Sequence, residues 1–322
     1  MSEPTFPVRV REMRYEALEV LSLVLETLER APLPAFEPGA HVDVFLSNGM
    51  SRSYSLSSLP TDRVSYRLTV AKDANSRGGS TFIHDQLRVG DILQISAPRN
   101  NFPLAEGAPF SIFIAGGIGV TPFIPMVRRL NERNAAWRLH YCVRSRDRAA
   151  LIDEITAYAA AGRGEAIPNF DHEPGGQMLD IERVLRDAPS GAHVYCCGPI
   201  GMLNAYRAAA QAVGLEPARV HFEYFSSNVE RALQGGFTVI CERSAKSVVV
   251  KPGETILEAL TSIGVDVPSS CQEGVCGSCE TRVISGVPDH RDMILSKSER
   301  ESGKAIMICC SGSKTDILVV DL

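Results

Sequence analysis

The sequence has no apolar run approaching the roughly 18 residues that a membrane helix requires, so we expect no membrane segment. Its N-terminus lacks a basic stretch followed by an apolar one, which argues against a signal peptide and favours a cytoplasmic location. A net charge of −5 gives no excess of positive charge for binding nucleic acid. With 322 residues, 44% of them hydrophobic, the chain can build two or three domains with separate cores.

The nine cysteines do not suggest a disulfide framework, because five of them are scattered: Cys142, Cys196, Cys197, Cys241 and Cys310. The other four form a pattern, in which Cys271, Cys276 and Cys279 are spaced C-x4-C-x2-C and Cys309 follows 30 residues after the third. This spacing is typical of a plant-type 2Fe-2S cluster. A zinc site is the alternative, but zinc ligands usually come as two close pairs. We therefore predict an iron-sulfur centre, assembled in reducing surroundings.

The N-terminal third predicts an antiparallel β-barrel. Residues 1–103 contain short apolar stretches, such as 18–25, 41–46 and 66–71, separated by turns rich in glycine, proline and asparagine. A helix is expected at residues 80–87.

The middle of the chain predicts an α/β domain with a parallel sheet over residues 104–226. Strands expected at 110–115, 137–143 and 193–197 alternate with helical stretches, a pattern that indicates nucleotide binding. Residues 227–235 have the composition of a linker.

The C-terminal part predicts an α+β domain over residues 236–322. It begins with a hairpin and a short helix, and it carries the four patterned cysteines. The predicted fold class is therefore multidomain: an antiparallel β-barrel, an α/β parallel-sheet domain and an α+β plant-type ferredoxin domain.

Two segments of the α/β domain are suited to a dinucleotide. Gly116, Gly117 and Gly119 separate a strand from a helix, where the backbone can approach a pyrophosphate, although such a turn can also be purely structural. Residues 196–199 follow a later strand and open another helix. Because ligands of parallel sheets lie at the carboxyl ends of the strands, we expect both segments to line one crevice.

The barrel carries groups suited to a flavin. Arg52, Tyr54 and Ser55 supply a cation, an aromatic ring and a hydroxyl at a strand end. Lys72 and the segment 77–80 offer a second anion site. Each could instead be a solvated strand edge, but their occurrence in one barrel favours a flavin.

The order of these motifs along nearly the whole chain resembles the phthalate dioxygenase reductase family, which includes vanillate demethylase reductases. That resemblance implies a flavin barrel, a pyridine-nucleotide domain and a C-terminal ferredoxin. It implies FMN, with FAD less favoured, together with NADH, and a Rieske-type oxygenase as the partner that receives the electrons.

The resemblance also implies roles for individual residues. Arg52, Tyr54 and Ser55 match the flavin motif, Gly78, Gly79 and Ser80 the phosphate loop, and residues 116–121, including Thr121, the nicotinamide nucleotide turn. Cys197 matches the position near the nicotinamide, and Phe225 the aromatic residue against the flavin. Asp171 matches an acidic position that favours NADH, whereas Arg144 and Arg146 could hold the 2′-phosphate of NADPH. Cys309 rather than Cys310 matches the fourth cluster ligand.

The resulting interpretation is an NADH-dependent relay through flavin and a 2Fe-2S cluster to an oxygenase. A self-contained flavin oxidase and a non-enzymatic iron-sulfur redox sensor are the alternatives. Acidic residues near the cysteines, Glu273, Glu280, Asp289 and Asp292, lie in a domain with nine basic and twelve acidic residues, a net charge of −3. We expect them to form a face that steers the partner.

Overall fold

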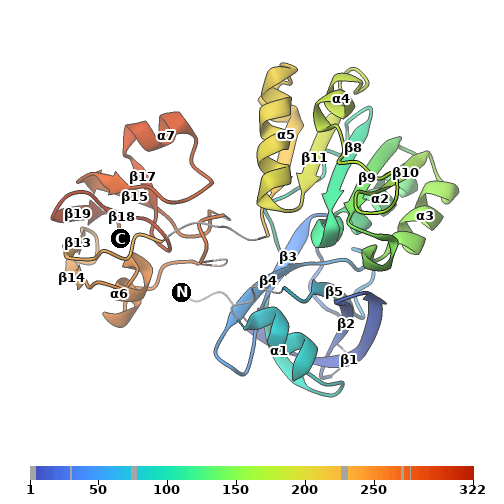
Figure 1. Ribbon diagram of the computed structural model, residues 1–322. Coiled ribbons are helices and arrows are strands. Elements are labelled where there is room, and N and C mark those ends of the chain that lie inside the picture. Colours follow the sequence, from blue (N-terminus) through green and yellow to red (C-terminus); the bar gives the residue numbers. More distant parts are fainter. Residues whose placement is uncertain (1–4, 30, 74–77, 226–230, 270–271, 276) are drawn as a thin grey trace. The chain divides into compact units, whose positions relative to one another are not determined.

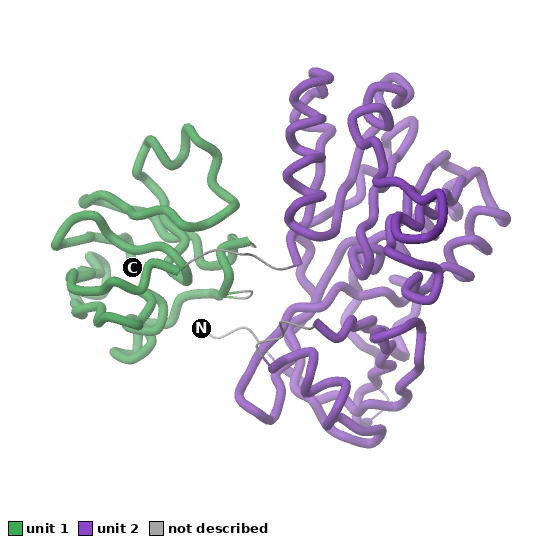
Figure 2. The backbone as a smooth tube through the Cα atoms, viewed as in Figure 1, with its two compact units in different colours: residues 1–3, 226–322 green, residues 4–225 purple. Residues whose placement is uncertain are grey.

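The computed structural model describes residues 5–29, 31–73, 78–225, 231–269, 272–275 and 277–322. The chain divides into two compact units after Phe225, and Figure 2 distinguishes them by colour. The larger unit contains the barrel and the parallel sheet, and the smaller one contains the patterned cysteines. Each unit is described by itself below.

The first seven strands form an antiparallel barrel. Their sheet follows the path β4-β3-β6-β1-β2-β5, β7 pairs with β3, and a bridge between Leu56 and Leu68 joins the two ends of the path. In β1, buried Val8 and Val10 alternate with exposed arginines, as a strand with one face on a core requires. The bounds are β1 (Thr5–Ala17), β2 (Val20–Thr27), β3 (Ala40–Phe45), β4 (Ser51–Ser55), β5 (Tyr66–Ala71), β6 (Ile92–Ser96) and β7 (Arg99–Asn100), with helix α1 (Gly79–Asp85) between β5 and β6.

The second part of the larger unit is a five-stranded parallel sheet in the order β10-β9-β8-β11-β12 (Figure 1). Every residue of its central strand is buried, which explains why that strand reads as a continuous apolar run. The strands are β8 (Ser111–Gly116), β9 (Trp137–Val143), β10 (Gly164–Phe170), β11 (His193–Cys197) and β12 (Val220–Glu223). The helices are α2 (Phe123–Glu132), α3 (Ile152–Ala161), α4 (Ile181–Arg186) and α5 (Ile200–Ala212), with short 3-10 turns at Gly117–Val120, Arg146–Arg148 and Pro217–Arg219.

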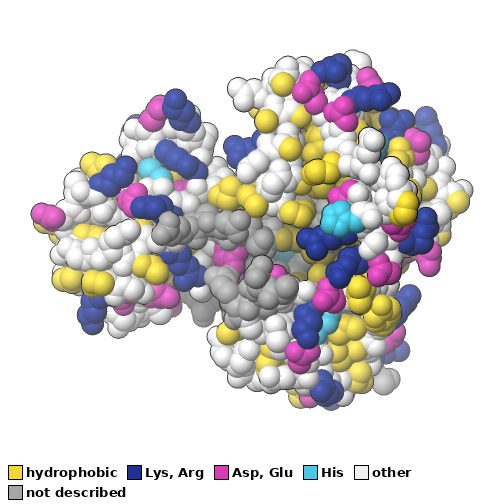
Figure 3. All heavy atoms as spheres, viewed as in Figure 1, with side chains coloured by type: hydrophobic (Ala, Val, Ile, Leu, Met, Phe, Trp, Pro, Cys, Tyr) yellow, Lys and Arg dark blue, Asp and Glu magenta, His cyan; other side chains and the backbone are white. Residues whose placement is uncertain are grey.

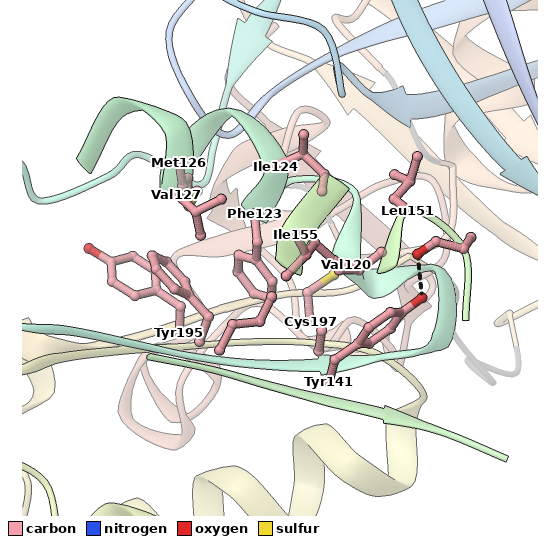
Figure 4. Packing of buried hydrophobic residues seen from close by; sticks show 14 of the residues in the cluster. Val120, Phe123, Ile124, Met126, Val127, Tyr141, Leu151, Ile155, Tyr195 and Cys197 are labelled. Carbon is pink, nitrogen blue, oxygen red and sulfur yellow. Dashed lines mark hydrogen bonds between the residues drawn. The ribbon is translucent and has the colours of Figure 1, made fainter. Parts of the chain in front are cut away.

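One face of this sheet packs against α2 and α3 in an aromatic core (Figure 4). Phe113 of β8 contacts Phe123 of α2 with ring centroids 5.0 Å apart, and it contacts Tyr195 of β11 at 5.1 Å. The hydroxyl of Tyr141 donates a 3.0 Å hydrogen bond to the carbonyl of Ala150. This core fixes the strands whose carboxyl ends form the candidate site.

The smaller unit is a mixed sheet with the order β14-β13-β19-β15-β17, covered by helix α6 (Ile256–Ser262). A capping box between Thr255 and Glu258 sets the start of α6, whose apolar side enters the core. The strands are β13 (Phe237–Cys241), β14 (Lys246–Val250), β15 (Glu280–Ser285), β17 (Ala305–Met307) and β19 (Ile317–Val320); β16 (Pro288–Asp289) pairs with β18 (Gly312–Ser313), and α7 (Lys297–Ser302) precedes β17.

The predicted fold class is confirmed in its three parts, and β9 and β11 have the predicted bounds. The sequence analysis did not identify β10, β12, α4 or α7 as elements. Within the described ranges, no helix is long and apolar enough to cross a membrane, as expected.

Candidate functional site

A cavity of about 850 Å³ in the larger unit lies at the carboxyl ends of the parallel strands. The turn after β8 and the start of α5 both line it, through Gly117 and Gly201 for example, so these segments share one crevice as predicted. Barrel residues Ala71 and Lys72 line the same cavity. Groups from both parts of the larger unit therefore surround one space.

The glycines of the turn have different physical roles. Gly117 has a φ of +55° and lines the cavity, so a side chain there would strain the backbone. A Cβ on Gly116 would lie 2.6 Å from Pro199, and one on Gly119 would overlap the carbonyl oxygen of Cys197. Gly116 and Gly119 thus allow the turn to pack against the end of β11. Thr121 is buried and donates a 3.0 Å hydrogen bond to the carbonyl of Ile118, so its hydroxyl secures the turn.

The end of the cavity near β9 and β10 contains both an acidic and a basic side chain. Asp171 and Arg144 line it, and Asp171 Oδ1 is buried with no hydrogen-bond partner within the described ranges. Arg146 instead places its guanidinium 4.7 Å from the centre of the Phe170 ring. Its backbone N–H donates a hydrogen bond to Glu173. Asp171 therefore offers an unused acceptor to a ligand, whereas Arg146 is occupied elsewhere.

Cys197 and Glu223 end neighbouring strands and are paired in register. The Cys197 side chain is fully buried, and burial raises the pKa of its thiol well above the ordinary value. Glu223 Oε2 is buried and accepts no hydrogen bond from the part of the chain that is described. Burial raises the pKa of Glu223 to about 8. The sequence analysis missed Glu223, because a single glutamate in a short strand carries no motif.

The flavin motif lies on β4. Ser55 Oγ is buried, with no hydrogen-bond partner in the described structure, and burial raises the pKa of the neighbouring Tyr54. Arg52 runs beside the start of α1, where a Cβ on Gly79 would lie 2.7 Å from the arginine side chain. Glycine at position 79 therefore leaves space for the guanidinium.

The second expected anion site is only partly available to a ligand. Lys72 forms a 2.6 Å ion pair with Asp85, and Ser80 Oγ accepts a hydrogen bond from the backbone N–H of Asp73. Gly78 has a φ of +104°, which a residue with a side chain would rarely adopt. Arg77, at the start of this segment, is outside the described residues. Phe225 is 38% exposed and ends the larger unit.

Two of the predicted cluster ligands, Cys271 and Cys276, lie outside the described residues. Cys279 and Cys309 are buried in the core of the smaller unit. Hydrogen bonds from Cys279 and Cys310 hold the pKa of Cys309 well below its usual range. Cys310 Sγ lies near the same loop, since it hydrogen-bonds Cys309 and a Cβ on Gly274 would lie 2.5 Å from it. The hydrogen bond between Cys309 and Cys279 favours Cys309 over Cys310 as the fourth ligand, which stays a prediction.

The expected acidic face needs one correction. The Asp292 side chain is fully buried, and its carboxylate accepts hydrogen bonds from the N–H groups of Ile294, at 3.1 Å, and Leu295, at 2.8 Å. It caps a turn and lies 3.6 Å from Arg300, so it is not a surface charge. On the face of the smaller unit seen in Figure 3, lysine and arginine side chains lie among the acidic ones.

Comparisons with known proteins agree with this arrangement. Residues 113–208 match the oxidoreductase NAD-binding domain, and residues 239–313 match the 2Fe-2S iron-sulfur cluster binding domain. The chain is 48% identical over 315 residues to phenoxybenzoate dioxygenase subunit beta of Ectopseudomonas oleovorans, covering 98% of this chain and 97% of the relative. It is 42% identical to tetrachlorobenzoquinone reductase of Sphingobium chlorophenolicum, covering 99% and 98%.

A solved structure of phthalate dioxygenase reductase, described as transferring electrons from pyridine nucleotides to a 2Fe-2S cluster, matches with a TM-score of 0.78. The two sequences are 36% identical over 99% of this chain and 98% of the other.

The chain belongs to the phthalate dioxygenase reductase family.

As a member of this family, it is an NAD-dependent flavin iron-sulfur oxidoreductase. The residues described above fit the three cofactors. The orphaned oxygens of Asp171 and Ser55 are free to bond a nucleotide and a flavin, and the buried cysteines suit thiolate ligation.

Proposed function

We propose that this protein is the reductase component of a Rieske-type oxygenase or demethylase system, passing electrons from NADH through FMN to its 2Fe-2S cluster and on to the oxygenase. The observation that carries this proposal is the shared cavity, where the turn after β8, the start of α5 and the barrel meet on a chain that also has a 2Fe-2S domain. When bound, a flavin converts a two-electron donor into a source of single electrons. The chain's own contribution is to bind and orient the nicotinamide nucleotide, the flavin and the cluster.

For the flavin, we propose that Arg52 contacts the phosphate or the ring edge, Tyr54 packs on the ring and Ser55 supplies a hydrogen bond. Two observations support these roles: the Arg52 side chain lies against Gly79, where a Cβ would collide with it, and the Ser55 hydroxyl has no partner among the described residues. Gly78, Gly79 and Ser80 would form the wall of the phosphate site. A charge-assisted contact to phosphate is worth about 1.5 to 3 kcal/mol, so Arg52→Ala should weaken FMN binding roughly tenfold or more.

Equilibrium titration of flavin-free protein with FMN measures this change. Arg128→Ala is a suitable control, because Arg128 lies on α2, where its half-buried side chain pairs with Glu132. Equal affinity in Arg52→Ala and the control would rule out the assignment. Titration with FAD beside FMN decides which flavin the barrel prefers.

For the nucleotide, we propose that Gly116, Gly117, Gly119 and Thr121 shape the pyrophosphate turn and that Asp171 accepts hydrogen bonds from the adenine ribose. A free carboxylate oxygen suits the two hydroxyls of NADH and repels the 2′-phosphate of NADPH. Asp171→Ser should therefore lower the preference for NADH over NADPH, measured as the ratio of flavin reduction rates. An unchanged ratio would contradict this assignment.

At the nicotinamide end, we propose that Cys197 and Phe225 border the ring and that Glu223 donates a hydrogen bond from its protonated carboxyl group. The buried, unpartnered Oε2 supports a donor to a ligand amide. The pairing of Glu223 with Cys197 supports its place at the end of β12. Glu223 would thus contact the same nucleotide as the turn between β8 and α2.

The partner assignment is tested by coupling the purified protein to a Rieske-type oxygenase and measuring product formed per NADH consumed. The proposal predicts tight coupling, with little dioxygen consumed when the oxygenase is omitted. Rapid dioxygen consumption by the reductase alone would favour the self-contained oxidase instead.

The relative named tetrachlorobenzoquinone reductase favours a second candidate function, the direct reduction of a quinone. NADH oxidation with a halogenated benzoquinone and no oxygenase measures this activity. A rate above the one supported by an oxygenase would make quinone reduction the main function.

A further inference from the structure

Among its described residues, the cysteine-bearing loop has three with positive φ: Gln272 at 53°, Gly274 at 72° and Gly277 at 78°. Two of them are glycines, for which this conformation has little cost, but glutamine adopts it rarely. Such residues turn backbone N–H groups toward one side of a loop and leave carbonyls directed away. The carbonyls then need donors from outside the loop.

Each of these carbonyls has a partner, and one of the three partners is a side chain. Gly274 O accepts from the backbone of Met293 at 2.8 Å, and Gly277 O accepts from the backbone of Glu280 at 3.0 Å. Gln272 O, next to Cys271 in the sequence, accepts from Nη2 of Arg231 at 3.0 Å. The strained glutamine is thus held by a side chain, and that side chain comes from the end of the segment that connects the two units.

The residue after Arg231 contacts the other ligand-bearing segment. The N–H of Ala232 donates a 2.8 Å hydrogen bond to the carbonyl of Cys310, which follows the predicted ligand Cys309. Ala232 is buried, and a Cβ on Gly312 would lie 2.8 Å from its side chain. Residues 231 and 232 therefore tie the cysteine loop to the segment of the fourth ligand.

We propose that Arg231 is a positioning residue for the 2Fe-2S cluster, which fixes the loop at Gln272 and raises the reduction potential of the cluster through its charge. This inference rests on the proposed function in one respect, that the four cysteines hold the cluster. Reduction adds one negative charge to the cluster, and a nearby fixed cation stabilises that state. A guanidinium remains charged at every working pH.

The experiment is an anaerobic redox titration of the holoenzyme, followed by visible absorption and by electron paramagnetic resonance of the reduced cluster. Arg231→Gln keeps some hydrogen-bonding capacity but removes the charge, so its midpoint potential should shift to lower values. Arg231→Lys keeps the charge and should stay closer to wild type. Arg243→Gln is the matched control, because Arg243 is an exposed arginine of the same unit that pairs with Asp321.

A second readout tests positioning separately from charge. Loss of iron to a chelator should be faster in Arg231→Gln than in wild type and in Arg243→Gln, because Gln272 is less well held. Arg231→Gln with the wild-type potential, resonance spectrum and rate of iron loss would overturn the inference. If Arg231→Gln does not fold, the Arg231→Ala/Gln272→Gly double variant takes its place, because glycine relieves the strain at position 272. A wild-type midpoint potential in the double variant would overturn the inference, and a lowered potential would support it.

These outcomes are distinct from failure of the proposed function. Wild-type protein without iron and sulfide would refute the cluster itself. A normal cluster in the wild type, together with unchanged potential and iron loss in the Arg231 variants, would refute only the role of Arg231.

Discussion

At the scale of single residues, the larger unit has several buried polar atoms that the described protein groups do not satisfy. Asp171 Oδ1, Ser55 Oγ and Glu223 Oε2 are examples. Leaving such groups unpaired costs about 1 to 3 kcal/mol each, so folded proteins seldom keep them without a bound partner. Asp171 and Ser55 could be predicted from motifs, but Glu223 could not, because its burial depends on the pairing of β12 with β11.

Glu223 should make flavin reduction pH-dependent. Its pKa is raised to about 8, so the carboxyl group is protonated below that pH and ionised above it. If the protonated acid donates to the nicotinamide amide, the rate of flavin reduction at low NADH should fall as pH rises through about 8. Glu223→Gln should remove this fall, because the amide remains a donor at all pH values.

Stopped-flow absorption over a series of pH values provides the measurement. Glu216→Gln, which changes an exposed glutamate before β12, should keep the wild-type profile. The same pH profile in Glu223→Gln and wild type would show that Glu223 does not control the step.

The adjacent cysteines Cys309 and Cys310 should differ sharply in their effect on the cluster. Cys309 lies beside Cys279, whereas Cys310 Sγ packs against Gly274 and contacts the carbonyl of Met307 at 3.7 Å. Cys309→Ser should remove or badly disturb the cluster, while Cys310→Ala should leave it in place. Iron and sulfide content with visible spectra would check both variants, and cluster loss from Cys310→Ala alone would move the fourth ligand by one residue.

At the scale of elements, the sequence predicted those with a strong apolar pattern and missed those without one. β8 is a nearly continuous apolar run, and β9 alternates apolar residues with Arg138 and His140, so both were predicted. β10 contains Pro168 and has no fully buried residue. α7 has no buried residue. β12 was missed because its four residues are only half-buried and its pairing with β11 defines it.

The contact between the turn after β8 and the end of β11 should be intolerant of added volume. A Cβ on Gly119 would overlap the backbone of Cys197 and Gly198, which cannot move as a side chain could. Gly119→Ala should therefore destabilise the larger unit by about 1 to 3 kcal/mol. In Gly201→Ala the new Cβ meets no atom within 4 Å, so a small gain from helix propensity is expected instead. Urea unfolding would compare the two, and equal midpoints would contradict the steric argument.

At the scale of the whole molecule, the residues proposed to bind nucleotide and flavin lie in one compact unit, and those proposed to hold the cluster lie in the other. The order of the motifs along the chain was enough to predict that these residues lie in separate domains. Surface charge was predicted less well, since Asp292 is buried and basic side chains lie among the acidic ones. Charge counted along the sequence does not distinguish a surface carboxylate from one that caps a turn.

Transfer to the oxygenase should depend on salt through the remaining acidic residues. Exposed Glu280 immediately follows the predicted ligand Cys279, so Glu280→Gln should lower the transfer rate at low ionic strength and flatten its salt dependence. Flavin reduction by NADH should change little. Glu301→Gln, on α7, serves as the control. A transfer rate that is insensitive to salt in the wild type would defeat the idea of electrostatic steering while leaving the electron relay intact.

The central claim is that electrons from NADH reach the cluster only through the flavin, and anaerobic stopped-flow mixing of the holoenzyme with NADH tests it most directly. The account predicts that flavin absorption falls first and cluster absorption follows. Flavin-free protein that keeps its cluster should show no cluster reduction, and added FMN should restore it. Cluster reduction at the full rate in flavin-free protein, or a cluster that stays oxidised after the flavin is reduced, would contradict the account.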